Sequence, residues 1–180
     1  HLTRHPYATI QSKKSTKLDI IPSYLSETIK SGREFGELEW LIGQENIMEF
    51  LTSVPKKNQI RIQFESLVKN PEKEINRICQ WLNIAYSTEM LDPYSNQKDK
   101  MTDGIHEVGL MIGDPKFHDH QKIDAQVADE WRNHVKEDFL SDYTWKIAQK
   151  LGYDPINSAY FQIQQAEQKA YYPLLTQQSR

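Results

Sequence analysis

The clearest structural signal in the chain is the segment of residues 60–82, IRIQFESLVKNPEKEINRICQWL. Its first five residues alternate and are rich in β-branched side chains, which predicts a strand over 60–64. Asn70, Pro71 and Glu72 then predict the start of a helix, because Asn can cap it and Pro loses no hydrogen bond there. Further apolar residues form one stripe at helical spacing: Ile75, Ile78, Cys79 and Leu82. A strand followed by a capped helix is half of a parallel β-α unit.

Two helices are predicted before this segment. Residues 1–5 read as the end of a strand that runs into a turn, because the residue before Pro6 avoids the helical region. Pro6 then stands at the first position of a weak helix over residues 6–12. A longer helix is predicted over residues 37–54, where apolar side chains recur at helical spacing until Pro55 stops the run.

Two further helices are predicted after it. Asp124 can cap a helix whose apolar face carries Val127, Ala128, Trp131 and Val135. Ser141 can cap another, which Gly152 closes, with Leu140 and Trp145 placed as a hydrophobic staple around the cap. All four tryptophans lie in helical patterns, so each is expected in the core: Trp40, Trp81, Trp131 and Trp145. Cys79 is expected to be buried and inert.

The composition limits the classes of function. A chain of 180 residues suits one domain, and 22 Lys plus Arg against 25 Asp plus Glu give a formal net charge of −3. Such a balance attracts neither nucleic acid nor an anionic membrane. A mean hydropathy of −0.73 and the lack of a long apolar run predict no membrane-spanning helix. With no visible secretory signal and one cysteine, we expect a cytoplasmic protein. Because the first residue is His1 rather than Met, we expect a piece of something longer.

The chain divides into a predicted domain over residues 1–153 and a Gln-rich tail or linker over residues 154–180. Within the domain, residues 92–120 are rich in Gly and Pro and predict a long loop, which in a compact domain is more often functional or mobile than idle. There is no Gly-rich phosphate loop followed by Lys and no Gly-x-Ser-x-Gly elbow.

Two sets of side chains could carry chemistry. If a helix begins near Pro6, Arg4 lies just before it and Ser12 lies about two turns along it. An anion beside that helix could accept hydrogen bonds from the planar guanidinium of Arg4 and from the hydroxyl of Ser12. On spacing alone, a surface Arg and a polar helix Ser are favoured. The second set consists of three histidines, His106, His118 and His120. His118 and His120 flank one residue, a spacing that can serve a metal, but the sequence fixes no third or fourth ligand. A hydrated loop is therefore favoured, and no metal site is predicted.

Three segments resemble the PAPS-dependent sulfotransferases, in their C-terminal portion, and look closest to the sulfotransferase domains of cyanobacterial modular polyketide and peptide synthases. Residues 1–12, HLTRHPYATIQS, resemble the strand-turn-helix whose Arg and Ser hold the 3′-phosphate of PAPS (3′-phosphoadenosine 5′-phosphosulfate). Arg4 and Ser12 match that pair. The resemblance runs from residue 1 to about residue 153.

The other two segments carry the remaining candidate residues. Residues 64–71, FESLVKNP, resemble the Tyr-Glu-Asp-Leu segment that precedes a helix, with Phe64 where many members have a Tyr near the adenine. Residues 101–118 resemble the late loop that closes over the nucleotide, which implies that Lys116 binds the cofactor. Leu110 stands where relatives usually have a basic residue. Losing one such charge-assisted contact costs about 1.5–3 kcal/mol.

The resemblance implies an α/β fold with a P-loop-NTPase-like parallel sheet and flanking helices, seen here as a mostly helical C-terminal part with few strands. It implies transfer of the sulfuryl group of PAPS to a hydroxyl acceptor. The family's phosphosulfate loop lies upstream of the Arg4 region, and the catalytic base commonly does too. We therefore expect this chain to hold the 3′-phosphate half of the site, to be catalytically incomplete and to contain no assignable catalytic residue.

The implied partners are PAPS as co-substrate, a small-molecule or carrier-protein-bound hydroxyl acceptor such as a β-hydroxyacyl chain, and adjacent domains of a larger synthase. Two alternatives stay open at this point. The chain could be a non-catalytic interaction or docking remnant of a sulfotransferase domain. Much more weakly, it could be a metal-dependent hydrolase that uses His106, His118 and His120.

Overall fold

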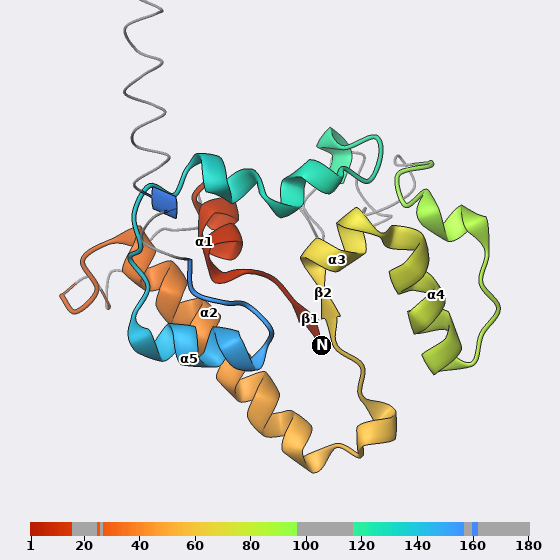
Figure 1. The fold of residues 1–180 in the computed structure, drawn as a ribbon, viewed down its shortest axis with the longest axis horizontal. Coiled ribbons are helices and arrows are strands. Elements are labelled where there is room, and N and C mark those ends of the chain that lie inside the picture. The colour runs from red at the N-terminus through yellow and green to blue at the C-terminus, as the bar shows by residue number, and fades with distance from the viewer. Residues whose placement is uncertain (16–24, 26, 97–116, 157–159, 162–180) are drawn as a thin grey trace, which may run out of the picture. The chain divides into compact units, whose positions relative to one another are not determined.

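The structure, a computed structural model, describes residues 1–15, 25, 27–96, 117–156 and 160–161 (Figure 1). The chain forms two compact units, each composed of two stretches of sequence. The first unit contains His1–Arg4 and Val54–Ala128, and the second contains His5–Ser53 and Asp129–Arg180. Residues 97–116, which include most of the late-loop segment at 101–118, and most of the Gln-rich tail lie outside the described residues.

The first unit is built on a two-stranded parallel sheet. Strand β1 (Leu2–Thr3) pairs with β2 (Ile62–Gln63), first residue opposite first and second opposite second. The amino group of His1 donates to the Ile60 carbonyl oxygen at 2.8 Å and extends this pairing backwards. The parallel β-α arrangement predicted from the sequence is confirmed. The predicted strand over 60–64 is shortened, because Phe64 already belongs to a helix.

Two helices follow β2 directly. Helix α3 (Phe64–Lys69) and helix α4 (Pro71–Leu82) meet at Asn70. Pro71 occupies the first turn of α4 as predicted, since the missing N–H costs nothing there. The predicted Asn70 cap is wrong: its side chain makes no capping hydrogen bond. Helix α4 ends at Asn83, which adopts the left-handed conformation that stops a helix (φ 56°).

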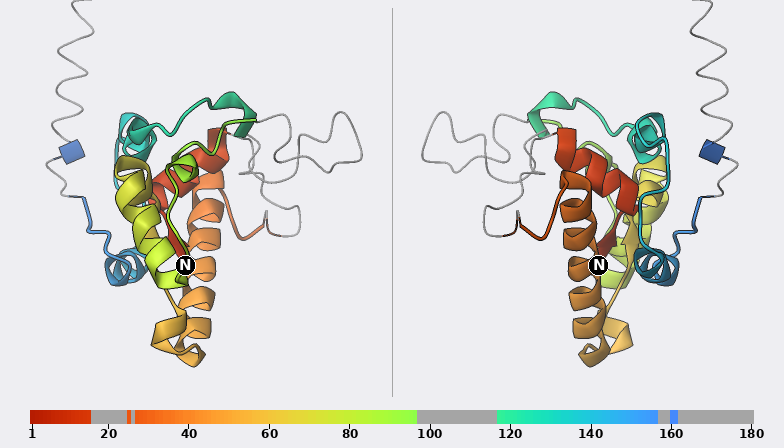
Figure 2. Two further views of the ribbon diagram at one scale, coloured as in Figure 1. Left: turned by 90° about the vertical axis from the view of Figure 1, so that its right-hand side faces the viewer. Right: turned by 90° about the vertical axis from the view of Figure 1, so that its left-hand side faces the viewer.

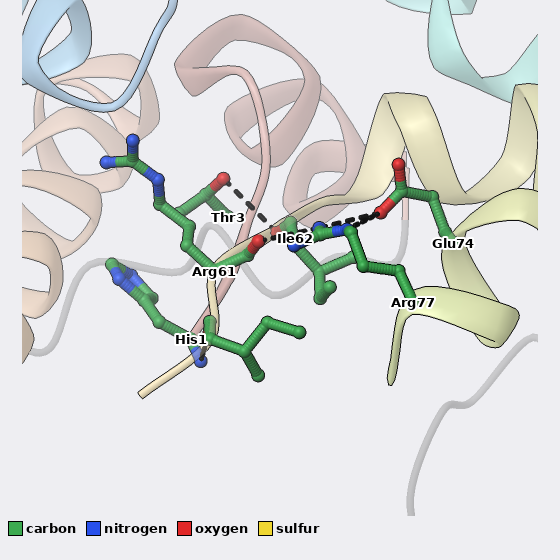
Figure 3. Close-up of polar contacts among 7 residues, drawn as sticks. His1, Thr3, Arg61, Ile62, Glu74 and Arg77 are labelled. Atoms are coloured by element: carbon green, nitrogen blue, oxygen red, sulfur yellow. Dashed lines mark hydrogen bonds and ion pairs between the residues drawn. The ribbon is translucent and has the colours of Figure 1, made fainter. Parts of the chain in front are cut away.

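An ion pair ties α4 to the start of β2 (Figure 3). Glu74 is buried, and its Oε2 accepts from Arg77 Nε at 3.0 Å and from Arg77 Nη2 at 2.7 Å. Arg77 Nη2 also donates to the carbonyl oxygen of Arg61 at 2.9 Å, one residue before the strand. A buried carboxylate is thereby satisfied by a fork of two N–H groups. On the same helix Cys79 is buried, as predicted, with its Sγ 3.6 Å from Met90 Sδ.

The second unit packs α1 (Pro6–Ser15) and α5 (Asp142–Lys150) against α2 (Gly32–Ser53). Helix α1 continues past residue 12, and α2 begins before residue 37, so both predicted helices exist and both are longer. Figure 2 shows α1 in red beside α2 in orange. They approach closely at Gly36, where a Cβ atom would lie 3.2 Å from Ile10 Cγ1.

The core of this unit is strongly aromatic. Its buried members are Tyr7, Ala8, Ile10, Trp40, Trp131, Val135, Leu140, Trp145, Ile147, Ala148, Leu151, Tyr153 and Phe161. Three of the four tryptophans are therefore core residues as predicted. The prediction for Trp81 is wrong: it belongs to the first unit and is 40% exposed, with its indole N–H donating to the Lys57 carbonyl oxygen at 3.0 Å.

The helix predicted after Asp124 is also wrong in type. Two short 3₁₀ helices form instead, η6 (Ala125–Ala128) and η7 (Glu130–Asn133). Asp129 (φ −115°, ψ −1°) separates them, and the boundary between the two units falls between Ala128 and Asp129. Asp124 still accepts from the Gln126 N–H at 2.8 Å. Other short 3₁₀ helices are η2 (Lys56–Asn58), η3 (Thr88–Leu91) and η5 (Phe117–Asp119).

Helix α5 begins and ends as predicted. The Ser141 hydroxyl accepts from the Thr144 N–H at 3.2 Å, which caps its first turn. At the other end Gly152 has φ 89°, a conformation that favours glycine. The N–H of Tyr153 donates back to the Ala148 carbonyl oxygen at 3.0 Å and closes the helix. Among the described helices, none is both long and apolar enough for a membrane crossing.

Candidate functional site

Arg4 and Phe64 come directly after the two paired strands. Because the register places Thr3 opposite Gln63, the next residue on each strand leaves the sheet at its carboxyl end. The guanidinium carbon Cζ of Arg4 lies over the Phe64 ring, 4.4 Å from its centroid. Both side chains are partly buried. The structure thus brings together two of the four site residues that the sequence predicts.

The local sequence explains this placement. Thr3 is 1% exposed, and its Oγ1 donates to the Ile62 carbonyl oxygen at 3.4 Å, which fastens the end of β1 to β2 (Figure 3). Phe64 begins α3, which packs against α4 and η6 of the same unit. Both backbones are therefore fixed within one or two residues of the pair. In open α/β sheets, ligands bind beyond the carboxyl ends of the strands, which is where Arg4 and Phe64 lie.

Ser12 lies on α1 in the second unit and is partly buried. Arg4 belongs to the first unit, so the convergence of these two side chains on one anion stays a prediction. Next to Ser12, Lys13 forms an ion pair with Glu39 of α2, with Nζ 2.6 Å from Oε2. Lys13 is therefore engaged in an ion pair within its own unit.

Lys116, the fourth predicted site residue, lies outside the described residues, as does Leu110. The same holds for His106 and for the side chain of His118. His120 is described, and its ring centroid lies 5.9 Å from that of Tyr94. The part of the chain that the structure describes holds no group of three side chains suited to a metal, which leaves the three-histidine hypothesis untested.

His5 is a residue with an unusual environment that the sequence reasoning missed. Its Nδ1 accepts from the Tyr7 N–H at 3.3 Å, the position that an Asn or Asp side chain often fills at a helix start. Its ring stacks on Trp131, with centroids 4.4 Å apart. Burial lowers the pKa of His5 to about 3, assisted by Arg132 and opposed by Asp129. The imidazole is therefore neutral at neutral pH. The sequence signal for its role at the start of the helix is its position directly before Pro6, the first residue of α1.

A polar cluster beside the aromatic core was missed too. The Tyr7 hydroxyl donates to Asp138, whose carboxylate also accepts from Trp145 Nε1 at 3.1 Å and from the Leu140 N–H at 3.0 Å. Burial and then the hydrogen bond to Asp138 raise the pKa of Tyr7 above its ordinary value. Tyr7 therefore stays protonated and holds α1 to the segment before α5. No sequence spacing signals a contact between residues so far apart.

The Arg4–Phe64 pair has the chemistry of an anion site. A guanidinium presents its N–H donors along its edge in a fixed fork that matches phosphate oxygens. The contact of its Cζ atom with the Phe64 ring places this cation at a defined position beside the sheet. Among the sequence-predicted residues that the structure describes, this pair has the clearest geometry for holding a phosphate or sulfate group.

Comparison with known proteins finds similarity to sulfotransferases. Residues 1–88 match the model of the Sulfotransferase family. A curated relative, the 3-beta-hydroxysteroid sulfotransferase of Cavia porcellus, is 23% identical over 156 residues, which is 83% of this chain and 52% of that protein.

Two solved structures are similar along most of the chain. The Sulfotransferase Domain from the Curacin Biosynthetic Pathway is 32% identical with a TM-score of 0.72, over 86% of this chain and 53% of that chain. The Sulfotransferase Domain from the Synechococcus PCC 7002 Olefin Synthase is 26% identical with a TM-score of 0.67, over 86% and 48%. The chain thus spans about half the length of each relative that it matches.

Proposed function

This chain is related to the sulfotransferase family, and from that relationship we propose that it takes part in transferring the sulfuryl group of PAPS to a hydroxyl acceptor. Arg4 is proposed to grip the 3′-phosphate of the nucleotide, with Ser12 as a second donor. Phe64 and Lys116 are proposed to complete the nucleotide site. This chain then contributes the 3′-phosphate half of the site.

The observation that carries the proposal is the guanidinium of Arg4 on the Phe64 ring, at the carboxyl end of parallel strands. The pair lies within residues 1–88, the part that matches the family model. A phosphate at that edge would meet a fixed positive charge with two parallel donors. The 3′-phosphate is remote from the sulfuryl group, so Arg4 and Ser12 position the nucleotide and do not touch the reacting atoms.

Sulfuryl transfer resembles phosphoryl transfer in what it demands of a protein. Charge develops on the transferred group and on the leaving oxygen, and the acceptor hydroxyl must approach in line. Holding the nucleotide by its far phosphate converts a diffusing donor into an oriented one. Loss of Arg4 is therefore expected mainly to raise the KM for PAPS and to change kcat less.

Binding by the unmodified chain tests the proposal. Calorimetry compares adenosine 3′,5′-bisphosphate with adenosine 5′-monophosphate, which lacks only the 3′-phosphate. We expect the bisphosphate to bind about tenfold to a hundredfold more tightly, the range for one charge-assisted contact. Equal affinity for the two nucleotides would contradict the assignment of the 3′-phosphate. Binding of neither would favour the docking-module alternative.

The acceptor is proposed to be a hydroxyl on an acyl chain bound to a carrier protein, with neighbouring synthase domains as partners. Support comes from the two solved relatives, which are sulfotransferase domains of a biosynthetic pathway and of an olefin synthase. Because the chain by itself is expected to be catalytically incomplete, the test uses a longer protein that contains it. A β-hydroxyacyl carrier protein incubated with PAPS and that longer protein should gain the mass of one sulfuryl group. Sulfation of a free hydroxylated small molecule in its place would contradict the carrier-bound acceptor.

A further inference from the structure

We propose that Met90 is a site of reversible oxidation, and that its sulfoxide releases the short helix η3 from α4 and exposes Cys79. Met90 lies in η3 and is 39% exposed, whereas Cys79 lies in α4 and is 3% exposed. Their sulfur atoms are 3.6 Å apart, a distance at which the thiol S–H donates weakly to the thioether sulfur. An accessible thioether is thus in direct contact with a buried thiol.

The local sequence produces this contact within the first unit. Helix α4 ends at Asn83, and the N–H of Ile84 donates back to the Cys79 carbonyl oxygen at 2.9 Å. Ser87 then starts η3, because its Oγ accepts from the Glu89 N–H at 3.3 Å. A few residues of chain therefore return to the end of the helix that they have just left, and η3 packs against α4.

The contact of η3 with α4 buries little of η3 itself. Thr88, Glu89 and Met90 are exposed, and Leu91 is half-buried. Elements that bury few apolar groups open locally at a lower free-energy cost than the core does. A change in the polarity of Met90 is therefore expected to shift the balance between η3 packed on α4 and η3 released from it.

Hydrogen peroxide supplies the chemical change. The thioether sulfur gives two electrons to the peroxide: one peroxide oxygen bonds to the sulfur, the O–O bond breaks, and the other oxygen leaves as water. The S=O group of the product is polar and needs a hydrogen-bond donor. Beside Cys79 it would meet only a weak donor, on a helix face that is otherwise apolar at Ile75 and Leu82. We expect the sulfoxide to leave this contact for water, and η3 to move with it.

Cys79 is the one cysteine of the chain, so its reactivity reports on the release of η3. The protein is treated with hydrogen peroxide, the peroxide is removed, and peptide mass spectrometry locates the added oxygen. The rate at which Cys79 reacts with Ellman's reagent is then measured. We expect protein with a sulfoxide at Met90 to react about fivefold to a hundredfold faster than untreated protein, the range for one buried polar group left without a partner. Methionine sulfoxide reductase should restore the slow rate.

Variants separate this role of Met90 from general oxidative damage. Met90→Leu keeps the apolar volume and cannot form a sulfoxide, so its Cys79 should react slowly before and after peroxide. Met90→Gln places a polar amide there and should react fast without peroxide. Met48→Leu removes a methionine that packs on the core of the second unit, and it should behave like the unmodified protein. Urea unfolding checks that each variant is folded, and Met90→Ile replaces the Leu variant if that one is not.

Three results would overturn the proposal. The first is an equal rate for oxidised and untreated protein, because the sulfoxide would then leave Cys79 covered. The second is the same acceleration by peroxide in Met90→Leu, because another residue would then cause it. The third is an oxygen atom on Cys79 while Met90 stays unmodified, because the thioether would then not be the accessible sulfur.

Discussion

Replacing His5 with asparagine is expected to reduce the loss of stability that this protein undergoes on mild acidification. The folded chain buries His5 against Trp131 and uses its Nδ1 as an acceptor for the Tyr7 N–H. Burial lowers its pKa to about 3. In the unfolded chain the imidazole titrates near its ordinary pKa of about 6.5. The unfolded state therefore binds one more proton than the folded state between those two values.

The sign and size follow from that difference. A depressed folded-state pKa contributes stability that is fully present above about pH 6.5 and is lost progressively as the pH falls toward about 3. One proton corresponds to about 1.4 kcal/mol for each pH unit in that window. Between about pH 7.5 and about pH 5, His5 alone should remove about 2 kcal/mol from the free energy of unfolding. The side chain is 8% exposed, so solvent screening is small.

Urea unfolding of both proteins at the two pH values measures this contribution. His5→Asn keeps a side-chain acceptor at the start of α1 and removes the titrating group. The stability of the unmodified protein should fall about 2 kcal/mol further than that of the variant. His134→Asn, at an exposed position of the same unit, serves as the control and should follow the unmodified protein. Equal losses of stability in the unmodified protein and in His5→Asn would show that His5 does not cause the loss.

Three other substitutions test the packing within the two units, all by urea unfolding. Glu74→Gln removes the charge that Arg77 binds through two N–H groups. We expect it to destabilise the protein by about 1–2 kcal/mol, because Glu74 is buried while Arg77 is half exposed. An unchanged free energy of unfolding would mean that the pair is not formed. Gly36→Ala adds a methyl group against α1 and should destabilise by about 1 kcal/mol. Gly43→Ala, in the same helix with open space around it, should stabilise by about 0.5–1 kcal/mol. The same sign for both would contradict the close approach of α1 and α2.

The elements predictable from the sequence are those with local causes. Pro71 at the start of α4, Ser141 at the start of α5 and Gly152 at its end each act within one helical turn. Their signals are therefore complete within a few neighbouring residues. The parallel β-α arrangement was also predicted, because a strand followed by a helix that starts at Pro71 is half of such a unit.

The errors occur where distant contacts override local preference. The apolar pattern after Asp124 fits an α-helix, but its residues divide between two units at Asp129, and two 3₁₀ helices form. Trp81 has a core-like position in its helix pattern, yet its indole N–H finds a partner at the surface in the carbonyl of Lys57. Helical periodicity alone does not specify which neighbours will be present.

The candidate site shows the same limit. Arg4 and Phe64 were each selected from the resemblance, but their contact depends on a strand register that spacing alone does not encode. The neutral imidazole of His5 depends on burial beneath Trp131, far along the chain. Residue types can thus be proposed from sequence, while their mutual contacts and protonation states require the three-dimensional arrangement.

Whether Arg4 binds the 3′-phosphate is tested by the effect of Arg4→Ala on the discrimination between adenosine 3′,5′-bisphosphate and adenosine 5′-monophosphate. Arg33→Ala, at an exposed arginine, provides the matched control. We expect Arg4→Ala to remove most of a preference of about tenfold to a hundredfold for the bisphosphate, and Arg33→Ala to preserve it. If the preference survives the loss of Arg4, the 3′-phosphate is held elsewhere and the account is contradicted.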